Sequence, residues 1–177
     1  MSSQTKLRLL FSRDEIEATV KRLADEISKD YEGKSPLLIG ILKGSFMFMA
    51  DLIRRLNLPL EVEFIRLSSY GRGKVSLGKI KVVQGLLSPI RGRDVIVIED
   101  IVDTGLTSAF LLDYLRKKKL ASLKLCALTD KPSRRQVPVN IDYLGLTVPN
   151  KFIVGYGLDW DEKFRYLPDI CVVEGEG

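Results

Sequence analysis

One stretch of the sequence, VIVIEDIVDTGLTS at residues 95–108, constrains the fold and the site together. Its first four residues are apolar and β-branched, which is typical of a buried strand. The apolar run leads directly to Glu99 and Asp100, and Asp103 follows three positions after Asp100. Like charges at one place repel each other unless a cation, a proton or a hydroxyl-rich ligand lies among them. The stretch therefore predicts a buried strand that ends at a ligand site.

The pattern around this stretch predicts an α/β fold. A capping-box sequence from Ser12 to Glu15 precedes apolar residues at helical spacing, so we expect a helix over about 13–29. Further helices are predicted over 46–56 and 106–119. Strands are predicted over 37–42, 60–67, 79–83, 93–98 and 122–129, and shorter ones in DYLGLTV, KFIVGY and ICVVE. Strands that alternate with helices favour a mainly parallel central sheet flanked by helices.

Length and composition indicate one globular domain. A chain of 177 residues is expected to bury roughly 70% of its unfolded surface, enough for a core without disulfides or metal. Hydrophobic residues make up 45% and charged residues 29%, which is typical of globular proteins. No repeat or linker divides the sequence, so we expect a single domain over residues 1–177.

The composition also excludes several kinds of site. The chain has no histidine, which removes Ser–His and Cys–His nucleophilic pairs and leaves acid–base chemistry to Asp, Glu, Lys or Tyr. Cys126 and Cys171 lie in predicted strands without metal-ligand spacing, so we expect buried, reduced thiols. The net charge of +5 predicts an anionic partner, either a phosphorylated small molecule or nucleic acid.

A cytoplasmic location is expected. The apolar stretches are short and interrupted by charges, so none is predicted to span a membrane. The N-terminal sequence MSSQTKLRLL lacks the apolar core and the cleavage site of a secretory signal.

The predicted ligand site lies where the strand ends and the next helix begins. In open parallel sheets, ligands bind outside the carboxyl ends of the strands. Backbone amides and the helix dipole favour a phosphate in the turn at 103–107, where Thr104 and Thr107 add hydroxyl groups. Glu99 and Asp100 could accept hydrogen bonds from a diol or bind a hard cation. The simpler alternative is that Asp103 is only a helix N-cap and Gly105 a turn residue. A sugar phosphate with a metal ion accounts better for three carboxylates.

The stretch at 95–108 resembles the phosphoribosyl-pyrophosphate-binding signature of type I phosphoribosyltransferases. The chain from about Leu38 to Glu174 also resembles the hypoxanthine-guanine phosphoribosyltransferases, with several separate motifs in the family's order. The resemblance implies the type I phosphoribosyltransferase fold, with a core over about 36–148 and a small hood formed by the N-terminal and C-terminal segments. It also implies Mg²⁺ as cofactor and a homodimer or homotetramer.

The resemblance implies roles for residues that handle the phosphoribosyl group and its leaving group. Asp103 would face N7 of the purine and act as the catalytic base. The phosphoribosyl group would be bound by Glu99, Asp100, Thr104, Gly105, Leu106 and Thr107. Pyrophosphate would be bound by Lys43, Gly44 and Arg165. In LKGS (42–45), the family often has a non-proline cis peptide bond.

Further motifs imply contacts with the base, the metal and a mobile loop. The purine would be bound by Lys131, Phe152, Ile153 and Asp159, and Mg²⁺ by Glu99, Asp100 and Asp159. Ser69 and Tyr70 in SSYG match the loop that closes over the site. Taken singly, such residues are more often surface lysines, core aromatics and plain turns. Their joint occurrence in order favours the site.

The reaction implied is transfer of the 5-phosphoribosyl group from phosphoribosyl pyrophosphate to hypoxanthine or guanine, giving IMP or GMP and pyrophosphate. One alternative is a nucleotide-sensing regulator that binds RNA or DNA, and another is a uracil- or adenine-specific transferase. The presence of both Lys131 and Phe152 disfavours these alternatives. RKKK (116–119) ends a predicted helix, where cations are expected without nucleic acid. Trp160 replaces a frequent tyrosine and the loop at 71–78 is short and basic, so base preference and loop closure stay open.

Overall fold

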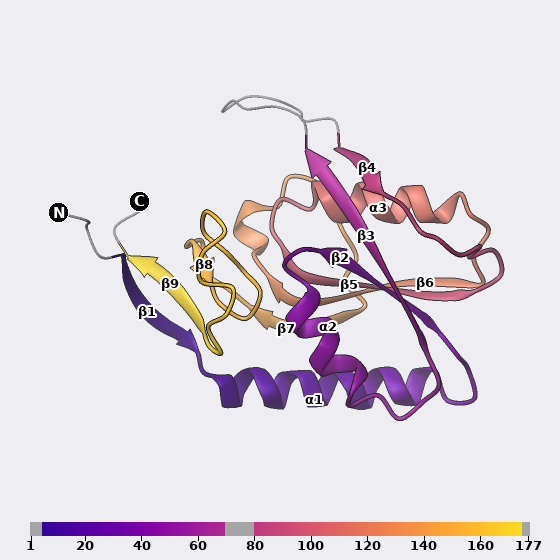
Figure 1. Ribbon diagram of the computed structural model, residues 1–177, viewed down its shortest axis with the longest axis horizontal. Helices are drawn as coiled ribbons and strands as arrows, with labels where there is room; N and C mark the ends of the chain where they lie inside the picture. Colours follow the sequence, from indigo (N-terminus) through magenta and orange to yellow (C-terminus); the bar gives the residue numbers. More distant parts are fainter. Residues whose placement is uncertain (1–4, 70–79, 175–177) are drawn as a thin grey trace.

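The protein, described here as a computed structural model over residues 5–69 and 80–174, contains two β-sheets (Figure 1). The side chain of Ser69 is not described. The larger sheet has the strand order β4-β3-β2-β5-β6-β7, and the smaller has the order β1-β9-β8. The larger sheet consists of β2 (Leu37–Leu42), β3 (Glu61–Ser69), β4 (Ile80–Gln84), β5 (Asp94–Val102), β6 (Ser122–Asp130) and β7 (Tyr143–Thr147). The smaller sheet consists of β1 (Lys6–Phe11), β8 (Ile153–Val154) and β9 (Ile170–Glu174).

The larger sheet confirms the predicted fold class. All of its neighbouring strands pair in parallel except β3 and β4. Helices cover both faces: α1 (Arg13–Asp30) and α2 (Phe46–Ile53) lie on one, and α3 (Leu106–Arg116) lies on the other (Figure 1). The short 3₁₀ helix η1 (Pro132–Arg134) follows β6. In the described part of the chain, no helix combines the length and apolarity needed to cross a membrane.

The apolar run at the start of β5 follows from this layering. Ile96 and Ile98 are fully buried in the cluster that contains residues of α1 and α2. Val95 and Val97 are fully buried in the cluster that contains residues of α3. Successive side chains of a strand point to opposite faces, so a strand covered on both faces must be apolar at every position.

Local sequence determines where α1 begins. Ser12 and Glu15 form the predicted capping box, in which the Ser12 amide donates to Glu15 Oε2 at 2.8 Å. The apolar positions of the helix then form its buried face, which packs on the larger sheet. These are Ile16, Val20, Leu23, Ala24 and Ile27.

Both chain ends contribute to the smaller sheet. β1 pairs antiparallel with β9, and β9 pairs antiparallel with β8. The sequence analysis predicted β8 and β9 but not β1. The side chains of β1 are exposed or half-buried, so its sequence carries little hydrophobic signal. Its partner strand is distant in sequence, and pairing of that kind is not encoded locally.

Three predicted element ends differ from the structure by three residues or more. β5 was expected to end at residue 98 but continues to Val102. α3 was expected to reach residue 119 but ends at Arg116, because Lys119 has a positive φ of 56°. α2 was expected to reach residue 56 but ends at Ile53, where the Arg55 amide donates to the Leu52 carbonyl in a tighter turn. Cys126 is buried, Cys171 is half-buried, and both thiols are free.

Candidate active site

The carboxyl ends of the parallel strands bring the predicted site residues to one edge of the larger sheet. β2 ends at Leu42, β5 at Val102 and β6 at Asp130, and the chain then enters the turns that contain Lys43, Asp103 and Lys131. β2 and β5 pair with each other in the middle of the sheet. The chain continues from β2 to β3 on one side of this pair and from β5 to β6 on the other side. This change of direction is the switch point at which open α/β sheets bind ligands.

Glu99 and Asp100 lie inside β5 rather than beyond its end, and their carboxylates contact different elements. Glu99 follows Val97 toward α3, where the Ser108 hydroxyl donates to Glu99 Oε2 at 2.5 Å. Asp100 lies against the turn that precedes α2, since a Cβ atom at Gly44 would be 1.8 Å from Asp100 Oδ2. A side chain at residue 44 would therefore displace the Asp100 carboxylate or the turn. The Glu99 carboxylate thus has a hydrogen-bond donor on α3, whereas the backbone amides of Asp100 and Ile101 stabilise the Asp100 carboxylate.

Burial makes both carboxylates unusually basic. It raises the pKa of Glu99 to about 8; the nearby Asp100 adds to the shift and the Ser108 hydrogen bond opposes it. Burial likewise raises the pKa of Asp100 to about 6; backbone amides and Arg165 oppose that shift, and Asp159 adds to it. Burial therefore favours the protonated form of Glu99. A cation or a set of hydroxyl donors at this place would favour the ionised forms.

The turn from Asp103 into α3 has the form of a phosphate-binding cradle. Gly105 is the N-cap of α3, with a positive φ of 84° and no side-chain cap. A Cβ atom there would lie 2.8 Å from both Arg135 Cδ and the Val137 carbonyl oxygen. The first amides of a helix lack acceptors within it and favour anions. The turn borders a pocket of 310 Å³, which is lined by Glu99, Asp100, Ile101, Asp103, Thr104, Gly105, Thr107 and Ser108.

Asp103 is placed as an acceptor and not as a helix cap. Its Oδ1 atom is buried and accepts no hydrogen bond within the described part of the chain. Arg134 Nε lies 3.3 Å from this oxygen as an ion-pair partner without hydrogen-bond alignment. Arg135 holds the Asp103 backbone, because its Nε donates to the Asp103 carbonyl at 3.2 Å and its Nη2 binds the Asp130 carboxylate. The simpler N-cap interpretation is wrong, since the cap is Gly105.

Two segments that are distant in sequence form an ion-pair cluster of Lys43, Asp159, Glu162 and Arg165 near Asp100. The Leu42–Lys43 peptide bond is cis. Lys43 Nζ lies 2.8 Å from Glu162 Oε2, and Arg165 Nη2 lies 2.9 Å from Asp159 Oδ1 and 3.5 Å from Glu162 Oε1. Glu162 thus pairs with both cations that the sequence analysis assigned to pyrophosphate.

Gly157 fixes this cluster against the turn after β2. Its carbonyl accepts from Arg165 Nη1 at 2.8 Å, and a Cβ atom at Gly157 would lie 2.1 Å from the Gly44 carbonyl oxygen. Gly157 also has a positive φ of 97°. The close approach of the two glycines therefore sets how the segment with Asp159 and Arg165 lies over the turn with Lys43.

The residues assigned to the purine lie next to this edge. Lys131 is only 5% exposed, and burial lowers the pKa of its ammonium, which the nearby Asp103 opposes. Phe152 is 41% exposed, and its ring centroid is 6.3 Å from that of Trp160. The Val148 amide donates to the Asp130 carbonyl at 2.8 Å. This hydrogen bond connects the segment between β7 and Phe152 to the residue that precedes Lys131. Ile153 follows, buried in β8.

The donor set fits a magnesium ion that arrives with a phosphorylated ligand. No group of three Asp, Glu, Cys or His side chains in the described residues is arranged as a metal site. The charge of Asp159 adds to the rise in the pKa of Asp100, and a cation beside the two carboxylates would oppose that rise. Proteins usually bind Mg²⁺ through one or two carboxylates together with substrate phosphates. The carboxylate of Glu99 is directed to Ser108 instead.

Sequence reasoning missed several residues of the site. Four residues that contact the predicted site residues were not identified from the sequence: Ser108, Arg135, Gly157 and Glu162. In the sequence, each is an ordinary helix, turn or loop residue. For Ser108 a signal existed, because a serine at a buried helix position facing a carboxylate-bearing strand needs a polar partner. For the others no signal existed. Of the predicted loop residues, Ser69 ends β3 and Tyr70 lies outside the described residues.

Comparisons with known proteins agree with this geometry. Residues 11–161 match the family model described as phosphoribosyl transferase domain. The bifunctional protein TilS/HprT of Listeria monocytogenes is 45% identical over 169 residues, but the chain spans only 26% of that protein's length. The hypoxanthine-guanine phosphoribosyltransferase of Aquifex aeolicus is 47% identical over 170 residues, which are 96% of each chain. A crystal structure of a hypoxanthine-guanine phosphoribosyltransferase from Bacillus anthracis has a TM-score of 0.91 at 44% identity, covering 96% of this chain and 99% of that one.

Proposed function

This chain belongs to the phosphoribosyltransferase family, and on that premise we propose that it transfers the 5-phosphoribosyl group from phosphoribosyl pyrophosphate to hypoxanthine or guanine. The products are IMP or GMP and pyrophosphate, which makes the reaction one of purine salvage. The observation that carries the proposal is the single sheet edge that joins the anion cradle before α3, the carboxylates of β5 and the buried Lys131. This edge offers backbone amides to the sugar phosphate, carboxylates to the ribose hydroxyls and a magnesium ion, and the Lys131 ammonium to the edge of the base.

The leaving group is stabilised by the cations on the two facing segments. Breaking the bond to the anomeric carbon builds negative charge on pyrophosphate and positive charge on the ribose. We assign the pyrophosphate to Lys43, the Gly44 amide and Arg165, which must exchange Glu162 for the substrate. The ribose hydroxyls are assigned to Glu99 and Asp100. Their ionised carboxylates also favour the positive charge that develops on the ribose.

The purine loses a proton as its nitrogen attacks, and Asp103 is the proposed base. Its buried Oδ1 has no aligned donor, so it can accept a proton or a hydrogen bond from the base. Lys131 is proposed to donate to the 6-oxygen, and the exposed ring of Phe152 to stack on the purine. Ser69 and Tyr70 stay proposed as part of a loop that excludes water from the reactive ribose.

We propose Mg²⁺ as the cofactor, held by Asp100 and Asp159 together with substrate oxygens, while Glu99 contributes to its charge environment. When bound, Mg²⁺ supplies positive charge to the pyrophosphate oxygens. The chain's own part is to keep the two carboxylates close and partly shielded from water. Their raised affinity for protons in the ligand-free protein is consistent with this role.

Self-association into a homodimer or homotetramer is also proposed. Large apolar side chains are exposed on the described surface, among them Phe46 at 41%, Val83 at 55% and Leu87 at 88%. Association of subunits would bury side chains of this kind. Light scattering of the purified protein distinguishes a monomer from the proposed assemblies.

A spectrophotometric assay over the common nucleobases tests the proposed function. With phosphoribosyl pyrophosphate and magnesium, we expect turnover of hypoxanthine and guanine, and little or none of adenine and uracil. Absence of turnover with every 6-oxopurine, together with tight binding of RNA or DNA, would point to a nucleotide-sensing regulator instead.

A further inference from the structure

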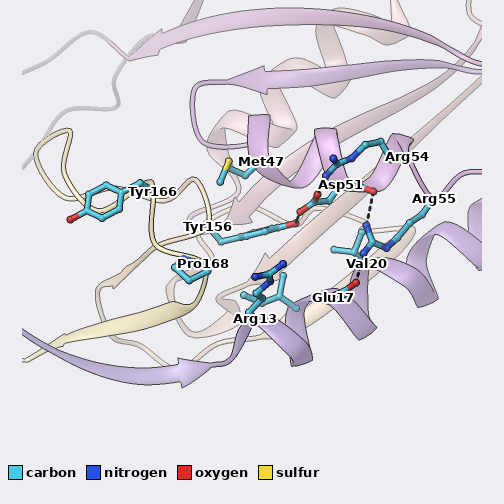
Figure 2. Close-up of a pocket in the computed structure, with 11 residues that line it drawn as sticks. Arg13, Glu17, Val20, Met47, Asp51, Arg54, Arg55, Tyr156, Tyr166 and Pro168 are labelled. Carbon is cyan, nitrogen blue, oxygen red and sulfur yellow. Dashed lines mark hydrogen bonds and ion pairs between the residues drawn. The ribbon is translucent and has the colours of Figure 1, made fainter.

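A second pocket of 310 Å³ lies apart from the residues of the candidate active site (Figure 2). It is formed by α1, α2 and the segment after β8. Its lining residues are Arg13, Ile16, Glu17, Val20, Met47, Asp51, Arg54, Arg55, Tyr156, Tyr166 and Pro168. None of them has a role in the proposed reaction. Figure 2 shows the polar ends of several of these side chains directed toward one another within the pocket.

The charges in this pocket leave one guanidinium without an ion-pair partner. Glu17 is paired with Arg55 at 2.7 Å. Asp51 accepts from the Tyr156 hydroxyl at 2.5 Å and is also paired with Arg54. In the described part of the chain, no carboxylate lies within ion-pair distance of the Arg13 guanidinium. Asp169 binds only the Arg13 backbone amide, at 2.7 Å.

The rest of the pocket is apolar or aromatic. Ile16 and Val20 of α1 and Met47 of α2 line one part, and Pro168 lines another. The Tyr166 ring is 76% exposed at the rim. An unpaired guanidinium beside such a wall suits a ligand that carries an anionic group on a flat apolar body. The planar fork of arginine binds carboxylate and phosphate groups through two parallel hydrogen bonds.

We propose that this pocket binds a small aryl anion, either a phosphate monoester or a carboxylate. Arg13 binds the anionic group, and the aromatic body packs on Met47, Pro168 and the Tyr166 ring. The volume of 310 Å³ suits a single ring with one anionic substituent rather than a dinucleotide.

The pocket is connected through the chain to the ion-pair cluster of Lys43, Asp159, Glu162 and Arg165. Tyr156 lines the pocket, and the next residue, Gly157, packs on Gly44 and accepts from Arg165. Met47 is three residues after Gly44 and also lies near Gly157. The pocket as described coexists with Lys43 and Arg165 paired to Glu162. A ligand that binds the pocket more tightly with these ion pairs in place than with pyrophosphate bound would weaken pyrophosphate binding, an effect that rests on the proposed function.

Methyl NMR with phenyl phosphate as the probe tests the binding site without any activity readout. The chain has three methionines, and two of them lie within the described residues as an internal comparison. Met47 lines the pocket, whereas Met49 is 1% exposed in the core. In protein labelled at the methionine methyl groups, phenyl phosphate should shift the Met47 signal saturably and leave Met49 nearly unchanged. Phenol, which lacks the anion, should bind more weakly.

Arginine variants identify the group that binds the anion. Arg13→Gln should weaken phenyl phosphate binding about tenfold or more, because it removes a charge-assisted pair of hydrogen bonds. The matched control is Arg116→Gln on α3, where a similarly exposed arginine pairs only with Asp113; this variant should bind as wild type does. An unshifted Met47 signal at millimolar probe, or equal affinity in the Arg13→Gln variant, overturns the proposal.

Direct titration of pyrophosphate by calorimetry tests the link to the active site. Phenyl phosphate should weaken pyrophosphate binding severalfold in wild type and have no such effect in Arg13→Gln. If the weakening persists in Arg13→Gln, the probe competes at the active site and the linkage is wrong. A protein that binds no pyrophosphate even without the probe would instead contradict the proposed function, while the Met47 result would still decide on the pocket.

Discussion

At the scale of single residues, Asp103 is the side chain on which the proposed chemistry most depends. Its buried Oδ1 lacks an aligned donor, although Arg134 lies 3.3 Å away. Asp103→Asn keeps the size of the side chain but removes the proton acceptor. We expect kcat to fall by roughly 10²–10⁴-fold, the usual contribution of a general base, with little change in the binding of phosphoribosyl pyrophosphate.

Steady-state kinetics and thermal unfolding of the same preparation separate this role from a structural one. Because Gly105 and not Asp103 caps α3, the unfolding temperature should change little. An unchanged kcat with a lowered unfolding temperature would assign Asp103 a structural role.

Lys131 is expected to select 6-oxo over 6-amino purines. An ammonium has three donors and no acceptor, so it can bind a carbonyl oxygen but meets only donors on the amino group of adenine. Because Lys131 is 5% exposed, a mismatched donor there would stay unsatisfied at a cost of roughly 1–3 kcal/mol. In Lys131→Gln, kcat/KM for hypoxanthine and guanine should fall and the ratio to adenine should narrow. An unaltered ratio would place the selectivity in the backbone near Ile153.

The buried Glu99 should make the ligand-free protein less stable as the pH rises. Its pKa is raised to about 8, so the folded protein binds this proton more tightly than the unfolded chain does. The contribution of Glu99 to stability is complete below its ordinary pKa and is lost as the pH rises through about 8. The unfolding temperature should therefore decline from about pH 5 to pH 9, and decline less in Glu99→Gln. Parallel curves for the two proteins would show that Glu99 is not protonated.

At the scale of elements, the turn between β2 and α2 determines whether the pyrophosphate site can form. A methyl group at Gly44 would lie 1.8 Å from Asp100 Oδ2. Gly44→Ala should therefore displace Asp100 or the turn, weaken pyrophosphate and magnesium binding strongly, and cost about 1–3 kcal/mol of folding stability. Gly85→Ala is the control, since its nearest neighbour would be Val82 Cγ1 at 3.7 Å. Equal behaviour of the two variants in calorimetric titration and thermal unfolding would refute the close contact.

Local signals in the sequence predicted the elements well where the determinants are local. The capping box at Ser12 gave the start of α1, and the apolar run before Glu99 gave a strand that is buried on both faces. The end of β5 was placed too early because adjacent acids usually end a buried strand. Here the Ser108 hydroxyl of α3 binds Glu99, and the backbone amides of Asp100 and Ile101 stabilise the Asp100 carboxylate.

At the scale of the whole molecule, long-range pairing was beyond the sequence. β1 pairs with β9 across almost the full chain, and Lys43 meets Glu162, which lies 119 positions later. No local pattern encodes these contacts. The order of motifs nevertheless predicted which residues meet at the sheet edge, because parallel strands place their carboxyl ends together. The pairing of Glu162 with Lys43 and Arg165 emerged only from the structure.

The central claim is that this sheet edge transfers a phosphoribosyl group to a 6-oxopurine. Its most direct test is to incubate the purified protein with labelled hypoxanthine, phosphoribosyl pyrophosphate and Mg²⁺, and to separate the products by anion-exchange chromatography. The account predicts IMP and pyrophosphate in equal amounts, neither of them formed when any one component is omitted. Release of pyrophosphate with ribose phosphate in place of IMP, or no reaction of hypoxanthine at all, would contradict it.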